Sequence, residues 1–171
     1  PNPSEELVTR IHVLKSACYS VEAPLHLGMI LAGADQKSLD DVSRFAIPVG
    51  VAFQIQDDWL GVFGTEACVG KPVTSDLEEG KKTLLTVFVR EHGSEEQRVR
   101  IQALLGKRGL SETELEEARS IFLSSGAVEY SEARAHDLVC EAKRALKGTE
   151  IPQRACTILN QLADYVIGRN T

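Results

Sequence analysis

Two adjacent carboxylates stand inside an apolar stretch near the middle of the chain. The stretch reads VAFQIQDDWLGVFG, and the two acids are Asp57 and Asp58. Burying an unpaired charge is strongly unfavourable even after the surrounding protein relaxes. The sequence therefore requires a partner for these charges, either basic side chains of a neighbouring element or a metal ion that prefers oxygen ligands.

The helical register of this stretch gathers its polar residues on one side. At about 100° per residue, Asp57, Asp58 and Gly61 lie within roughly 60° of Gln54, and apolar side chains occupy most of the remaining circumference. Gln56 is the exception, because it falls on the apolar side. This polar stripe (Gln54, Asp57, Asp58 and Gly61) on a mostly buried helix predicts a cavity wall at which Mg²⁺ neutralises the carboxylates.

Three lysines are candidates for binding a polyanion that shares this metal. Lys71 and Lys81 each follow a glycine in VGKPVTSDLEEGKKT, and Lys15 lies among apolar residues in LKSACYSVEAPLHLG. Any one of them alone would be interpreted as a solvated surface lysine. Carboxylates followed by two such lysines instead favour a bound diphosphate, held by Mg²⁺ and by ammonium groups together.

Helical signals recur along the chain, whereas the alternation typical of strands is scarce. Ser75 or Asp76 is a candidate cap for a helix that Gly93 ends, and Ser111 with Glu114 forms a capping-box pattern before the next apolar run. These signals predict an all-α bundle of about seven helices.

Composition restricts the classes of protein that fit. Hydrophobic residues make up 43% and charged residues 26%, as in ordinary globular proteins, and the net charge of −6 argues against a nucleic-acid or anionic-membrane surface. No apolar run approaches the about 20 residues of a membrane span. The four cysteines are far apart and form no CxxC pair, which favours a cytoplasmic location and argues against a zinc site.

The strings FQIQDDWLGVFG and GKPVTSDLEEGKKT resemble the second aspartate-rich motif of the trans-isoprenyl diphosphate synthases, the polyprenyl synthetase family, and the lysines that follow it. KSACYSVEAPLHLGMILAG resembles the family's Lys-Thr motif and the next helix. The matches span about residues 10–92 and agree in order, spacing and flanking residues. The resemblance implies an all-α, multi-helix bundle of the isoprenoid synthase type with a central cavity, of which residues 1–171 are the C-terminal part of a single domain.

The resemblance also implies a reaction. Isopentenyl diphosphate is condensed with an allylic diphosphate to give a longer trans-polyprenyl diphosphate, through Mg²⁺-dependent ionisation, attack on the carbocation and loss of a proton. By position in the motif, Asp57 would bind Mg²⁺ directly and Asp58 would support it from behind.

Five residues are assigned to the substrate by the same resemblance. Lys15, Lys71 and Lys81 would bind the allylic diphosphate. Gln54 and the backbone of Lys15 and Ser16 would face the allylic cation.

Three departures from the family pattern bear on these expectations. Gly61 stands where many members carry a third aspartate, and Ser16 replaces the common threonine. The first aspartate-rich motif does not occur in these residues, and the start, PNPSEELVTRIH, resembles an internal part of a longer sequence. We therefore expect these residues to be the C-terminal part of a longer protein whose N-terminal helices are missing here. The full-length protein is expected to be a homodimer, and this segment alone is expected to be inactive.

Two alternatives remain open at this point. A class I terpene cyclase shares metal-assisted ionisation of a diphosphate, but its Asn/Asp, Ser/Thr and Glu metal triad is not evident here. A non-catalytic, prenyltransferase-like subunit that regulates a partner synthase would also lack the first motif. A subunit without catalysis need not retain Asp57, Lys71 and Lys81 together.

Overall fold

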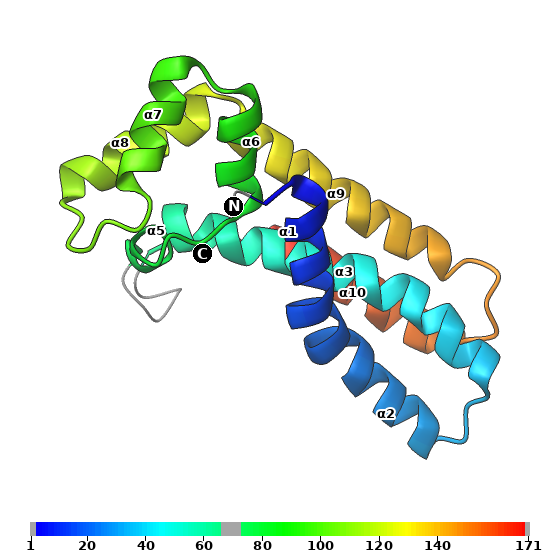
Figure 1. Cartoon of the computed structure of the whole chain (residues 1–171). Helices are drawn as coiled ribbons and strands as arrows, with labels where there is room; N and C mark the ends of the chain where they lie inside the picture. Colours follow the sequence, from blue (N-terminus) through cyan, green and yellow to red (C-terminus); the bar gives the residue numbers. More distant parts are fainter. Residues whose placement is uncertain (1–2, 66–72, 170–171) are drawn as a thin grey trace. The chain divides into compact units, whose positions relative to one another are not determined.

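All the regular elements of the described chain are helices (Figure 1). The computed structural model describes residues 3–65 and 73–169. The predicted all-α class is therefore confirmed. Within these residues, no helix has both the length and the apolar character that a membrane span requires.

The chain divides into two compact units. Unit 1 comprises Pro1–Val8, Asp57–Ala133 and Asn170–Thr171, and unit 2 comprises Thr9–Gln56 and Arg134–Arg169. Three helices continue from one unit into the other: α1 (Glu5–His12), α3 (Gln36–Phe63) and α9 (Ala127–Ala145).

Unit 2 is built around the first three quarters of α3. The helix α1 leads without a break into a π-helix, η1 (Val13–Glu22), and then into α2 (Ala23–Leu31). The later part of α9 and α10 (Gln153–Gly168) complete the unit. Its core residues are almost fully buried and are mostly small or branched: Ala17, Val42, Phe45, Ala46, Val49, Ala52, Ala142 and Ala163.

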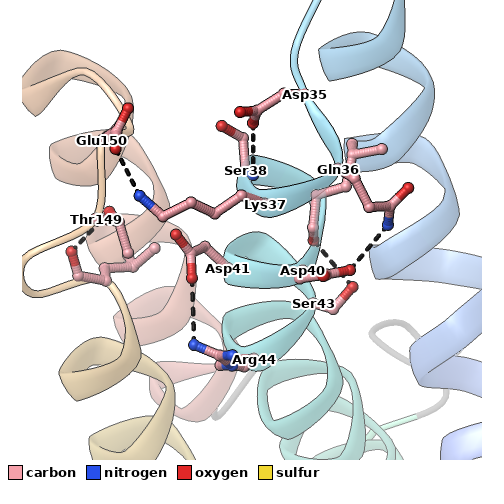
Figure 2. A network of polar contacts seen from close by, with 12 residues as sticks. Asp35, Gln36, Lys37, Ser38, Asp40, Asp41, Ser43, Arg44, Thr149 and Glu150 are labelled. Atoms are coloured by element: carbon pink, nitrogen blue, oxygen red, sulfur yellow. Dashed lines mark hydrogen bonds and ion pairs between the residues drawn. The ribbon is translucent and has the colours of Figure 1, made fainter.

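The beginning of α3 is held by side-chain contacts (Figure 2). Asp35 accepts a hydrogen bond from the backbone N–H of Ser38 at 2.9 Å, which is an N-cap contact, and this bond lowers the pKa of the Asp35 carboxyl. Lys37 forms an ion pair with Glu150, which lies between α9 and α10, with 2.5 Å between Nζ and Oε1. These contacts set the start of the helix that carries the polar stripe.

Gly50 allows α3 and η1 to approach closely. A Cβ atom at this position would lie 2.4 Å from the Cα of Ala17 and 2.6 Å from its Cβ. Both are far inside van der Waals contact, and neither atom belongs to a flexible side chain. Gly50 therefore determines how near η1 lies to α3.

Replacing Gly50 by alanine should destabilise the protein by about 1–3 kcal/mol or more, because overpacking forces backbone shifts. Gly28→Ala is the matched control, since Gly28 also lies in a helix of unit 2 and a Cβ there would meet nothing within 4 Å. That variant should be stabilised by up to about 1 kcal/mol, the helix preference of alanine over glycine. Urea unfolding measures both, and equal stability of the two variants would contradict the close-contact argument.

Unit 1 collects α5 (Ser75–Glu78), α6 (Leu84–His92), α7 (Glu95–Leu104) and α8 (Glu112–Ser124) with the end of α3 and the start of α9. Capping boxes begin α6, α7 and α8, and the box formed by Ser111 and Glu114 was predicted from the sequence. The helices share one apolar cluster that includes Val62, Leu85 and Phe122.

The predicted cap at Ser75 or Asp76 is wrong for the long helix that follows. These residues belong to α5, a single turn, after which the chain turns at Gly80 with φ of 65°. The next helix, α6, is capped instead by the side chain of Thr83. The predicted end of this helix at Gly93 is confirmed, because α6 ends at His92.

Candidate active site

The polar stripe lies on α3 as its helical register predicts. Asp58 is only 5% exposed and Asp57 is half-buried, while Ala52 and Ile55 are buried in the core. Asp57 and Asp58 belong to unit 1, and Gln54, three residues before Asp57 on the same helix, belongs to unit 2.

Gln56, the polar residue on the apolar side of α3, is a buried hydrogen-bond donor. Gln56 is only 7% exposed. Its side-chain Nε2 donates a hydrogen bond to the backbone carbonyl of Arg169 at 2.8 Å. The Arg169 guanidinium lies 4.3 Å from the centroid of the Phe53 ring. Gln56 thus satisfies its polar group by holding the segment after α10 against α3.

Ser16 and Gln54 are brought together from separate helices of unit 2. Ser16 is buried on η1, and its hydroxyl donates a hydrogen bond to Oε1 of Gln54. Lys15, the preceding residue, is exposed. Because π-helices are rare and occur often at functional sites, the position of Ser16 on η1 is consistent with its assignment to the substrate.

Asp76, predicted from the sequence only as a helix cap, is a further candidate site residue. It is 4% exposed, and its Oδ2 lies 2.3 Å from the place where a Cβ of residue 61 would stand. Its carboxylate thus lies directly against the polar stripe at Gly61. The sequence did contain one signal for this role of Asp76: a glycine at residue 61, where an aspartate is common in the family that the motif resembles. A missing side chain there leaves room for another group.

Lys81, predicted to bind a diphosphate, forms an ion pair with this same carboxylate. Its Nζ lies 2.7 Å from Oδ1 of Asp76, and its backbone N–H donates to the Asp76 carbonyl at 3.0 Å. Lys71, the other lysine predicted after a glycine, lies outside the described residues.

Two aromatic rings follow the acids on α3. Trp59 and Phe63 stack with their centroids 5.4 Å apart and pack against the apolar cluster of unit 1. The indole Nε1 of Trp59 is buried, and among the described residues it has no hydrogen-bond partner.

Asp57 and Asp58 on α3 are oxygen donors of the chemical kind that Mg²⁺ prefers. Within residues 3–65 and 73–169, no group of three or more His, Cys, Asp or Glu side chains is arranged to hold a metal. Mg²⁺ is commonly bound by one or two carboxylates together with substrate phosphates and water. Asp57 and Asp58 provide donors of this kind.

Comparison with protein families and curated proteins gives consistent matches. The model of the polyprenyl synthetase family matches residues 2–122. Geranylfarnesyl diphosphate synthase of Aeropyrum pernix is 38% identical over 151 residues, which make up 87% of this chain and 46% of that protein. A short chain isoprenyl diphosphate synthase of Methanothermobacter thermautotrophicus is 36% identical over 92% of this chain and 47% of its own length. The chain thus spans about half the length of the curated relatives it matches.

Solved structures match over nearly the whole chain. Geranylgeranyl pyrophosphate synthase of Corynebacterium glutamicum, complexed with isoprenyl diphosphate and magnesium, superposes with a TM-score of 0.92 at 33% identity, covering 98% of this chain and 48% of that one. Polyprenyl synthase of Caulobacter crescentus, complexed with calcium and isoprenyl diphosphate, gives a TM-score of 0.88 at 26% identity, covering 99% and 51%.

Proposed function

Because the chain belongs to the polyprenyl synthetase family, we propose that it takes part in condensing isopentenyl diphosphate with an allylic diphosphate to a longer trans-polyprenyl diphosphate. The observation that carries the proposal is the pair of carboxylates, Asp57 and Asp58, on a helix that is otherwise largely buried in apolar surroundings. A cytoplasmic homodimer is part of the proposal.

The carboxylates and lysines would bind the diphosphate of the allylic substrate. Asp57, the more exposed acid, would hold Mg²⁺, with Asp58 behind it. Bound Mg²⁺ supplies positive charge that stabilises the departing diphosphate. Lys81, Lys71 and Lys15 would donate hydrogen bonds to the diphosphate, and their positive charges would lower the barrier to ionisation.

Gln54 would face the carbon that becomes positive. A carbonyl oxygen carries partial negative charge, and the hydrogen bond from Ser16 holds the Gln54 amide so that its orientation is defined. A fixed dipole stabilises a developing charge more effectively than one that must reorient during the reaction.

The proposal is tested in a hybrid enzyme. In the Aeropyrum pernix synthase, the 151 matched residues are replaced by the corresponding residues of this chain. A control hybrid carries the corresponding residues of the Methanothermobacter thermautotrophicus synthase. Labelled isopentenyl diphosphate, Mg²⁺ and each allylic primer should give longer prenyl diphosphates with both hybrids. No incorporation by the first hybrid, when the control is folded and active, would contradict the proposal.

Ser16→Ala should lower kcat of the hybrid enzyme by about 3- to 10-fold with little change in KM, since a neutral hydrogen bond contributes about 0.5–1.5 kcal/mol. Ser16→Thr keeps the hydroxyl and should retain most of the activity. Ser20→Ala is the matched control, because Ser20 is an exposed serine of the same π-helix. Steady-state kinetics compare the three variants. A loss confined to KM in Ser16→Ala would argue against a role in the ionisation step.

A further inference from the structure

We propose that Asp76 is a positioning residue for Lys81 and that Gly61 provides the space that Asp76 requires. The inference rests on the proposed role of Lys81 in binding diphosphate. The inference adds that the position of the Lys81 ammonium depends on Asp76 and Gly61, two residues outside the acid pair Asp57 and Asp58.

The first argument is steric. The space beside residue 61 is already taken by the Asp76 carboxylate, whose Oδ2 would lie 2.3 Å and whose Cγ would lie 3.0 Å from a Cβ there. A side chain at residue 61 would have to displace a carboxylate that is 4% exposed. Gly61 and Asp76 are therefore coupled, so that the glycine in QDDWLG makes room for the acid of α5.

The second argument is electrostatic. A carboxylate buried to this degree needs compensation, and Lys81 provides it at 2.7 Å. Lysine has a flexible four-carbon stem, and an ion pair with a buried acid restricts where its ammonium can lie. The Lys81 side chain is 31% exposed, so it is also reached by solvent.

The third argument is position along α3. Gly61 follows Asp58 by three residues and Asp57 by four, and residues at these spacings are neighbours on a helix surface, with about 5–6 Å between Cβ atoms. Asp76 contacts α3 at Gly61, about one helical turn from the proposed metal ligands, and it holds the ammonium of Lys81 beside this part of the helix. A diphosphate bound there would meet a cation already in place, which reduces the ordering required on binding.

The first test needs no ligand. The ¹⁵Nζ NMR signal of Lys81 in the full chain, assigned by its loss in Lys81→Arg, reports directly on the ammonium group. We expect a distinct signal in the wild type and an averaged, solvent-like signal in Asp76→Asn, which preserves the shape of the side chain. Gly61→Ala should give the same change. An unaltered Lys81 signal in Asp76→Asn would overturn the proposal.

The second test is a double-mutant cycle on binding of inorganic diphosphate in the presence of MgCl₂, measured by NMR titration. Lys81→Met should weaken binding by about tenfold or more. Asp76→Asn should weaken it several-fold when Lys81 is present and less than about twofold when Lys81 is already methionine. Lys82→Met and Glu79→Gln are matched controls, because both residues are exposed neighbours in the same segment. Equal losses from Asp76→Asn in both backgrounds would overturn the positioning role.

The two tests separate this inference from the proposed function. If the wild-type chain binds no diphosphate with Mg²⁺ while the Lys81 signal still depends on Asp76, the proposed role of the lysine is wrong and the positioning contact is supported. If the wild type binds diphosphate and the cycle shows no coupling, the proposed function is supported and the positioning role is wrong.

Discussion

Asp57→Asn should lower kcat of the hybrid enzyme by about 10²–10³-fold, the usual effect of removing one group that stabilises charge in a transition state. The substitution keeps the size of the side chain and removes the negative charge that would hold Mg²⁺. Because Asp57 is half-buried and its neighbour Asp58 is the more deeply buried acid, the folded state should lose little stability. Single-turnover rates at saturating allylic substrate measure the effect on ionisation.

Asp137→Asn serves as the matched control for this substitution. Asp137 is an exposed acid on α9, and its replacement should leave kcat unchanged. Urea unfolding of both variants separates loss of activity from loss of structure. Activity of Asp57→Asn within a few-fold of the wild type would refute the assignment of this residue to the metal.

The 171-residue chain alone should turn over the two substrates at least about 10³-fold more slowly than the hybrid enzyme, because each 1.36 kcal/mol of transition-state stabilisation that is lost lowers the rate about tenfold. Its motif supplies one acidic stripe, whereas the relatives that it matches are about twice as long. With a single stripe, the departing diphosphate would be poorly stabilised. Radiolabel incorporation by equal molar amounts of chain and hybrid measures the difference.

Exposed apolar side chains provide a second measurement on the isolated chain. Within unit 2, large hydrophobic residues of α1, η1 and α2 lie on the surface: Ile11, Leu14, Tyr19, Leu27, Ile30 and Leu31, the last 89% exposed. A surface of this kind favours association. We expect size-exclusion chromatography to show concentration-dependent association of the chain.

Turnover by the isolated chain at a rate close to that of the hybrid would refute the prediction that a single acidic stripe stabilises the departing diphosphate poorly.

The polar stripe was predictable because its determinants are local. The spacing of Gln54, Asp57 and Asp58 follows from helical periodicity alone, and the structure places them on one helix, α3. The same holds for the cap at Ser111, whose partner Glu114 is three residues away. In both cases the sequence contains every residue that the local conformation requires.

The remaining features depend on contacts between distant segments. Gln56 was an exception to the predicted register, and its partner Arg169 lies 113 residues away. The Leu77 carbonyl of the single turn α5 accepts a hydrogen bond from the backbone N–H of Gly106, after α7, and no local pattern indicates this contact. The apolar periodicity of a helix also does not distinguish the i→i+5 bonding of η1 from ordinary α-helical bonding.

The stacked pair on α3 gives this protein a built-in optical reporter. Trp59 is the only tryptophan of the chain, and it lies one residue after Asp58 and two before Gly61. Its buried indole N–H has no hydrogen-bond partner among the described residues, and an excited indole in such surroundings emits at shorter wavelength than one in water. Tryptophan emission from this chain therefore comes from the helix turn that carries the acids, and rearrangements there can be followed without an added dye.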